Sequence, residues 1–268
     1  MKNFRLVAIA LSILALAACR PAPSANETPR ETLPSIPAIP ATTPVSRENL
    51  DWWVDLHNRF NGQAKEAAQN GDIDLIFLGD SITYQWSGPG KDVWEEYYAT
   101  RHAVNFGIGG DRTQHVLWRI EHGNLDGLAN PAKGHAPKLL VLMIGTNTSG
   151  EDTPEAIADG IRADVAKIRE KLPTTKVLLL AIFPRGEHPN EYRERVAKAS
   201  ELVRSIADAR MIHYLDIGSQ FLEPDASIHK EIMPDFLHLS ADGYRLWADA
   251  VSPVLHREVD VPPVPAKH

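Results

Sequence analysis

The stretch Leu75-Ile76-Phe77-Leu78-Gly79-Asp80-Ser81 decides the interpretation of this chain. Its first four residues form a continuous apolar run, which is typical of a strand buried on both faces in a parallel sheet. A glycine directly after such a strand allows a sharp turn. The serine then lies at the carboxyl edge of the sheet, where open α/β sheets bind ligands. Gly, Asp and Ser are also common turn residues, so the tripeptide alone is a weak indication of a nucleophile.

Outward from this stretch, apolar runs alternate with segments of helical spacing. Strands are predicted at 74–78, 103–106, 139–144, 177–183 and 211–217, and helices at 48–69, 93–99, 112–122, 154–172, 190–209 and 241–256. Continuous apolar strands that alternate with helices predict an α/β fold. We expect a three-layer α/β/α sandwich around a five-stranded parallel sheet. Thr153 and Ser240 are predicted helix caps, and Asp111 is predicted to cap the helix that follows it.

Composition restricts the function classes. With 43% hydrophobic and 24% charged residues, the 268-residue chain has the balance of a soluble globular protein. The net charge of −7 and the absence of a Lys/Arg-rich run argue against a nucleic-acid partner. Cys19 is the only cysteine, so the chain can form no intramolecular disulfide.

The N-terminus has the pattern of an export signal. Lys2 and Arg5 precede an apolar stretch, 6–18, that is too short to span a bilayer as a mature helix. A simple secretion signal would look similar. However, Leu16-Ala17-Ala18-Cys19 resembles the lipobox of bacterial lipoproteins. That resemblance implies lipidation of Cys19 and a membrane partner. With Arg20 after the cysteine, it implies retention at the outer membrane of the cell envelope, facing the periplasm.

The prolines suggest domain boundaries. Seven of the twenty prolines lie in residues 20–46, and such a segment favours extended conformers over a packed core. We therefore predict a signal peptide at 1–18, a Pro-rich linker at 19–47, a single domain at 48–258 and a disordered tail at 259–268.

Polar signals follow four of the five predicted strands. Ser81 follows the first strand, Gly110 the second and Asn147 the third, whereas Asp235 and His238 lie in a long loop after the fifth. In a parallel sheet these positions converge on one edge. Ser81 could attack a carbonyl if His238 took its proton and Asp235 oriented the imidazole. The N–H groups of Ser81 and Gly110 and the Asn147 amide could bind an oxyanion.

These residues resemble the four motif blocks of the SGNH, or GDSL-type, hydrolases. The stretches Asn105–Arg119, Pro184–Asn190 and Leu237–Ser240 are similar to the catalytic subunits of intracellular platelet-activating-factor acetylhydrolase. The resemblance implies a flavodoxin-like fold, a Ser81–His238–Asp235 triad and an oxyanion hole of Ser81, Gly110 and Asn147. It also implies a short acyl group, acetyl above all, and a possible homodimer. An N-terminal lipobox departs from those cytosolic animal enzymes.

We therefore predict a serine esterase that needs no cofactor or metal and acts on an O-acetylated glycan or a lipid ester. The chain lacks a G-x-S-x-G elbow, which argues against the α/β-hydrolase fold. Two other classes stay open. One is a non-catalytic glycan- or lipid-binding lipoprotein, and the other a metal-dependent phosphoesterase built on Asp80, Asp111, Asp235 and His238. Trp86, Met233, Phe236 and Leu237 could shape a pocket or belong to the core.

Overall fold

The structure, a computed structural model, describes residues 40–148 and 152–260. The predicted signal peptide, Cys19, most of the predicted linker and most of the predicted tail lie outside the described residues. Lipidation of Cys19 therefore stays a prediction. Within the described ranges, no helix has the length and apolar character needed to cross a bilayer.

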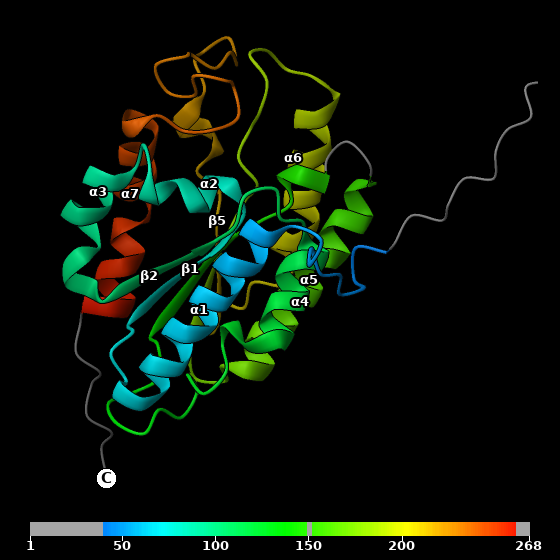
Figure 1. The fold of residues 1–268 in the computed structure, drawn as a ribbon. Helices are drawn as coiled ribbons and strands as arrows, with labels where there is room; N and C mark the ends of the chain where they lie inside the picture. Colours follow the sequence, from blue (N-terminus) through cyan, green and yellow to red (C-terminus); the bar gives the residue numbers. More distant parts are fainter. Residues whose placement is uncertain (1–39, 149–151, 261–268) are drawn as a thin grey trace, which may run out of the picture. The chain divides into compact units, whose positions relative to one another are not determined.

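Five parallel strands form one sheet (Figure 1). The strands are β1 (Leu75–Gly79), β2 (Ala103–Gly107), β3 (Leu139–Met143), β4 (Lys176–Leu180) and β5 (Ile212–Leu215). Their order is β2-β1-β3-β4-β5, which is the flavodoxin-like order. This confirms the predicted fold class. Strand β4 ends three residues earlier than predicted, because its neighbour β5 ends at Leu215; the apolar residues 181–183 are buried outside the strand.

Within the described residues, seven α-helices connect or flank these strands. They are α1 (Asp51–Asn70), α2 (Ser81–Tyr84), α3 (Lys91–Tyr97), α4 (Thr113–Arg119), α5 (Pro154–Lys171), α6 (Glu191–Arg204) and α7 (Ala241–Leu255). The caps at Thr153 and Ser240 are confirmed, because each hydroxyl accepts a backbone N–H of the first turn at 3.2 Å. The single turn α2 was not predicted. The prediction that Asp111 caps the next helix is wrong, since Arg112 occupies that position.

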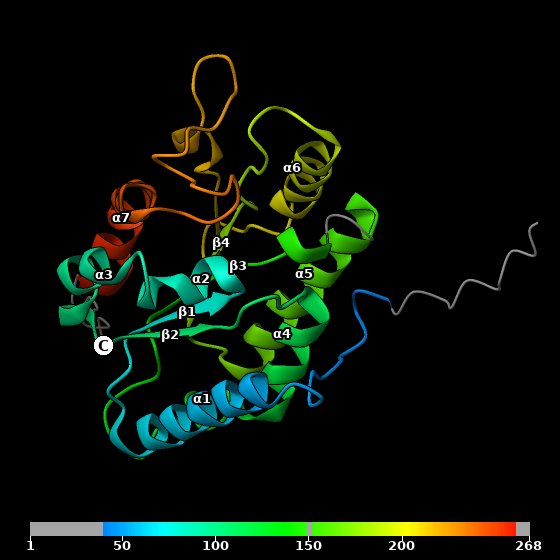
Figure 2. The same cartoon turned by 45° about the horizontal axis from the view of Figure 1, so that its top comes forward.

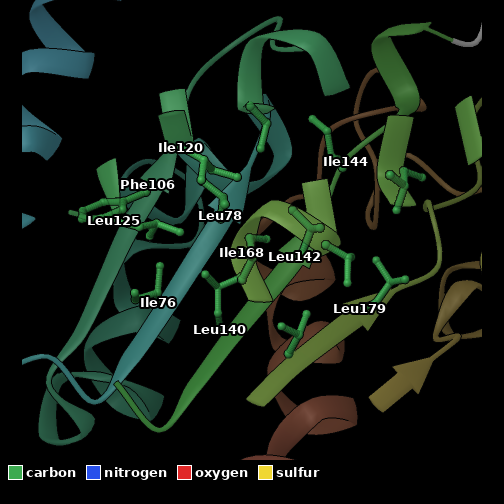
Figure 3. Packing of buried hydrophobic residues seen from close by; sticks show 14 of the residues in the cluster. Ile76, Leu78, Phe106, Ile120, Leu125, Leu140, Leu142, Ile144, Ile168 and Leu179 are labelled. Atoms are coloured by element: carbon green, nitrogen blue, oxygen red, sulfur yellow. The ribbon is translucent and has the colours of Figure 1, made fainter. Parts of the chain in front are cut away.

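The alternation of side chains along each strand separates two hydrophobic cores. Ile76 and Leu78 of β1 face a core shared with α1, α4, α5 and α6 (Figure 3). Leu75 and Phe77 face the opposite core, shared with α3 and α7. Figure 2 shows the two helical layers on either side of the strands. The predicted α/β/α sandwich therefore has a core on each face of one sheet.

Aromatic rings fill much of the α3–α7 core. The Trp86 ring centroid lies 4.4 Å from that of Tyr244 and 4.9 Å from that of Trp247, and Phe77 packs edge-on against both tryptophans. Trp86 is 1% exposed and Met233 is fully buried, so both belong to the core. Aromatic pairs at such separations add about 0.5–1.5 kcal/mol each beyond the area they bury.

The packed region extends beyond the predicted domain boundaries. Ala41 is buried, and its carbonyl accepts a hydrogen bond from the Thr113 hydroxyl at 3.2 Å. The Val45 N–H donates to the Gln114 carbonyl at 3.1 Å. At the other end, Val259 is buried. Residues 40–47 and 259–260 thus pack on the domain, because specific hydrogen bonds and burial compensate for a composition typical of extended chain.

Candidate active site

The turn from β1 into α2 places Ser81 at the carboxyl edge of the sheet. Gly79 ends β1, Asp80 caps α2, and Ser81 is the first residue of that helix. A Cβ on Gly79 would lie 2.3 Å from both the Met143 carbonyl oxygen and the Thr83 hydroxyl oxygen. No side chain fits there, so glycine allows the helix to start directly against the end of β3. This close approach fixes the position of the Ser81 side chain.

Ser81, His238 and Asp235 form a continuous hydrogen-bonded row. The distance from His238 Nε2 to Ser81 Oγ is 2.9 Å, and that from His238 Nδ1 to Asp235 Oδ2 is 2.7 Å. When Nδ1–H donates to the carboxylate, Nε2 presents its lone pair to the serine hydroxyl. The structure therefore brings together the three residues that the sequence analysis selected, in the order needed for proton transfer.

The loop carrying Asp235 holds its carboxylate in place. Asp235 Oδ1 accepts the N–H of Leu237 at 3.1 Å and that of His238 at 2.7 Å. The loop closes through Phe236, whose φ of 59° lies in the left-handed region. Partial burial alone would raise the pKa of Asp235, but hydrogen bonds from the His238 ring and backbone outweigh it and lower this pKa below its ordinary value. The carboxylate therefore stays charged at neutral pH.

The three predicted oxyanion donors belong to neighbouring turns. The Ser81 N–H opens α2, where the first amides have no acceptor inside the helix. Gly110 is exposed, with a φ of 72°. Two hydrogen bonds connect its loop to the rest of the site: Ile108 N–H donates to the Gly79 carbonyl at 3.2 Å, and the Asn147 side-chain amide donates to the Asp111 carbonyl at 2.8 Å. The Asn147 amide has a second N–H besides the one that donates to the Asp111 carbonyl.

Asp80 is the helix cap that its residue type indicates, and it is also a buried carboxyl group. Its Oδ1 accepts the Ile82 N–H at 2.9 Å, which caps α2 behind the serine. The side chain is fully buried, and Oδ2 accepts no hydrogen bond from a described residue. Burial is the main reason why the pKa of Asp80 rises from 3.8 to about 7. The Asp80 side chain of the folded protein is therefore a neutral carboxylic acid at mildly acidic pH.

A buried ion pair holds in place the loop after β2 that contains Gly110. The Arg119 guanidinium donates to Asp111 Oδ2 at 2.8 Å, and both side chains are fully buried. It also donates to the carbonyls of Phe106 at 3.0 Å and Gly79 at 3.3 Å, the ends of β2 and β1. Asp111 therefore anchors the loop instead of capping a helix. Arg119 on the apolar face of a predicted helix was the signal that could have indicated this pair.

The described residues do not gather the four groups that the phosphoesterase alternative requires. In residues 40–148 and 152–260, no three His, Cys, Asp or Glu side chains come together as metal ligands would. Asp80 and Asp111 are buried, whereas Asp235 is largely exposed and bonded to His238. Phe236 and Leu237 flank the histidine, half-buried against the α3–α7 core.

An α/β/α sandwich with a serine, a histidine and a carboxylate at the carboxyl edge of its sheet is an arrangement found among carboxylic ester hydrolases. The model of the GDSL-like lipase/acylhydrolase family matches residues 77–246. The chain belongs to this family, and it is a carboxylic ester hydrolase.

Individual known proteins and solved structures that are similar to the chain agree with this family assignment. The chain is 36% identical over 222 residues to human platelet-activating factor acetylhydrolase IB subunit alpha1, covering 81% of this chain and 90% of that one. It is 37% identical to the rat alpha2 subunit, covering 76% and 85%. Its fold is similar to that of a GDSL-like lipase from Bacteroides thetaiotaomicron (TM-score 0.57, 17% identity, covering 75% and 97%). A carbohydrate acetylesterase family member from Sinorhizobium meliloti also has this fold (TM-score 0.52, 18% identity, covering 70% and 99%).

Proposed function

We propose that this protein hydrolyses short-chain esters through a covalent acyl-enzyme on Ser81. The observation that carries the proposal is the 2.9 Å contact between Ser81 Oγ and His238 Nε2, with Asp235 bonded to the other ring nitrogen at 2.7 Å. A serine hydroxyl becomes an effective nucleophile when an adjacent base takes its proton. Asp235 fixes the imidazole tautomer and stabilises the imidazolium that forms.

The reaction then proceeds in two halves. Ser81 Oγ attacks the ester carbonyl carbon while its proton passes to His238 Nε2. The tetrahedral intermediate collapses as the bond to the alcohol oxygen breaks, and His238 gives the proton to that oxygen. A water molecule, deprotonated by His238, attacks the acyl-serine and releases the carboxylic acid. Donors from Ser81, Gly110 and Asn147 stabilise the oxyanion in both halves, and each is worth about 3 kcal/mol of the barrier in comparable hydrolases.

For the substrate we propose an acetyl ester. The relatives at 36–37% identity are named acetylhydrolases, and one protein of similar fold is named a carbohydrate acetylesterase family member. The alcohol that carries the acetyl group in this ester is a glycan or a lipid. Release of acetate from acetylated polysaccharide, compared with acetate release from an acetylated lysophospholipid, separates the two. A preference for p-nitrophenyl butyrate over p-nitrophenyl acetate would contradict the acetyl assignment.

A fluorophosphonate probe tests the nucleophile directly. Mass spectrometry of the labelled protein should find the adduct on Ser81, and Ser81→Ala should lose both labelling and esterase activity. Ser87→Ala is the matched control, because Ser87 lies in the next turn and its hydroxyl donates to the Tyr84 carbonyl. An adduct on another residue, or esterase activity in Ser81→Ala, would refute the mechanism. Absence of esterase activity in the wild-type protein would favour the non-catalytic alternative.

For the location we propose lipid anchoring through Cys19 at the outer membrane, with the domain in the periplasm. The proposal rests on the sequence Leu16-Ala17-Ala18-Cys19-Arg20. Cys19→Ser should abolish incorporation of labelled fatty acid and release the protein from the membrane fraction. Labelling that persists in this variant would contradict the proposal.

A further inference from the structure

The peptide unit between Gly109 and Gly110 carries the Gly110 N–H of the proposed oxyanion hole. The Asp111 N–H donates to the Ile108 carbonyl at 3.2 Å, which closes a four-residue turn with the two glycines at its centre. Gly110 has a φ of 72°, and the φ of Gly109 is not positive. This combination defines a type II turn. A rotation of the central peptide converts type II into type I and reverses the direction of the Gly110 N–H.

Two central glycines provide little steric resistance to that rotation. A Cβ on Gly109 would meet no heavy atom within 4 Å, so nothing packs against this side of the turn. Glycine adopts both positive and negative φ readily. The orientation of the Gly110 N–H must therefore be selected by a group that contacts the peptide itself.

Arg47 is that group. Its Nη1 donates to the Gly109 carbonyl oxygen at 2.7 Å, and no other described residue donates to this oxygen. Both terminal nitrogens of the guanidinium lie 3.2 Å from the place where a Cβ on Gly110 would stand. The side chain is 19% exposed, and its guanidinium lies 5.2 Å from the Trp52 ring centroid. Nη1 is also 3.4 Å from Asp111 Oδ1.

In a trans peptide the C=O and N–H groups point in opposite directions. A donor that binds the Gly109 oxygen therefore fixes the direction of the Gly110 N–H, away from Arg47. It also polarises the peptide and makes this N–H a better donor. We propose that Arg47 is a positioning residue that selects the type II turn and so directs the Gly110 N–H at the oxyanion. This proposal rests on the proposed function of the same site.

Residues 40–47 thereby contribute to the positioning of the Gly109–Gly110 turn. Arg47 reaches the loop because the segment before α1 is fixed on the domain. The Val45 N–H donates to the Gln114 carbonyl at 3.1 Å, and the Leu50 N–H donates to the Arg47 carbonyl at 2.9 Å. The residue lies in a stretch whose composition predicts only a linker.

Kinetics of Arg47→Ala test the proposal, because an oxyanion donor acts on the transition state and not on the bound substrate. Loss of one such donor costs about 10²- to 10³-fold in kcat. Since the turn still visits type II without Arg47, we expect kcat for p-nitrophenyl acetate to fall about 10- to 100-fold. KM and the thermal midpoint should stay near the wild-type values. Inactivation by the fluorophosphonate should slow in parallel. Arg204→Ala, which removes an arginine near the Tyr214 ring, is the matched control.

Two further measurements separate positioning from a purely structural effect. Guanidinium ion at millimolar concentration should restore part of the kcat of Arg47→Ala, and Arg47→Lys should retain more kcat than Arg47→Ala. An unchanged kcat in Arg47→Ala would overturn the proposal, as would a loss of kcat that comes with a matching loss of stability and no rescue. If Ser81→Ala is inactive while Arg47→Ala is fully active, the proposed function stands and this inference fails. Activity in Ser81→Ala would refute the proposed function itself.

Discussion

The substitution Asp80→Asn should change how the stability of this protein depends on pH. Asp80 is fully buried, and one of its oxygens accepts only the Ile82 N–H that caps α2. Asparagine keeps that acceptor and has nearly the same shape, but it does not titrate. The variant therefore removes the proton equilibrium of this side chain while leaving the helix cap in place.

The size of this change in the free energy of unfolding follows from the pKa of Asp80. Burial, the largest influence, raises the pKa of Asp80 from 3.8 in the unfolded chain to about 7 in the folded protein. Below pH 3.8 both states hold the proton, and Asp80 has no effect on the pH dependence. Between 3.8 and 7 only the unfolded state loses the proton, so the free energy of unfolding falls by about 1.4 kcal/mol per pH unit. From pH 5 to pH 8 the wild type should therefore lose about 3 kcal/mol that Asp80→Asn keeps.

Urea denaturation at pH 5, 6, 7 and 8 measures this difference. The quantity to follow is the free energy of unfolding of Asp80→Asn minus that of the wild type, whose change with pH is independent of any constant effect of the substitution. Asp225→Asn is the control: hydrogen bonds from Ser227 lower the pKa of Asp225, so this residue is charged in both states above pH 5 and its difference should stay flat. A flat difference for Asp80→Asn as well would refute a neutral buried Asp80.

Four further substitutions probe the site and the residues that support it. Asp235→Asn should lower kcat about 10³- to 10⁴-fold in p-nitrophenyl acetate hydrolysis, because the amide cannot hold the imidazole in the required tautomer; a loss below tenfold would contradict the role given to Asp235. Asp111→Asn should lower the free energy of unfolding by about 3–5 kcal/mol in urea denaturation, since it leaves the buried Arg119 guanidinium without a counter-charge; a loss below about 1 kcal/mol would mean that the pair is not needed. Gly110→Ala should lower kcat at least about tenfold, because φ at this residue is 72° and the added methyl meets Arg47 at 3.2 Å, whereas Gly109→Ala meets nothing within 4 Å and should retain activity. Equal kcat values in the two alanine variants would contradict this reasoning.

Much of the fold was predictable because the local signals agree with one another. The apolar run ending at Leu78 is a buried interior strand of the sheet, between β2 and β3, and the caps at Thr153 and Ser240 start helices where predicted. The order of the sheet and the convergence of Ser81, Asn147 and His238 on one edge follow from parallel strands joined by helices. For the candidate site, residue type and strand position selected Ser81, His238 and Asp235, and the structure places these three side chains in hydrogen-bond contact.

The supporting interactions were not predictable, because they depend on contacts between residues far apart in sequence. Asp111 precedes a helix and looks like a cap, but its position opposite Arg119 and Trp53 is set only when α1 and α4 pack together. Arg47 lies at the end of a Pro-rich stretch whose composition indicates extended chain. Its contact with Gly109 exists only because that segment is fixed on the folded domain. Local propensity carries no information about such pairings.

Both hydrophobic cores contain packed tryptophans, so each face of the sheet carries its own spectroscopic signal. Trp86 and Trp247 lie together on the α3–α7 face, with ring centroids 4.9 Å apart, and Trp53 and Trp118 lie together on the opposite face at 5.4 Å. Tryptophans held this rigidly give near-ultraviolet circular dichroism, which is lost when specific packing is lost. Trp94 also packs against Trp86 on the α3–α7 face, with ring centroids 5.9 Å apart. Replacing Trp53 and Trp118 by phenylalanine would therefore leave a near-ultraviolet tryptophan signal that comes chiefly from the α3–α7 face, and the loss of packing in that layer could be followed by spectroscopy.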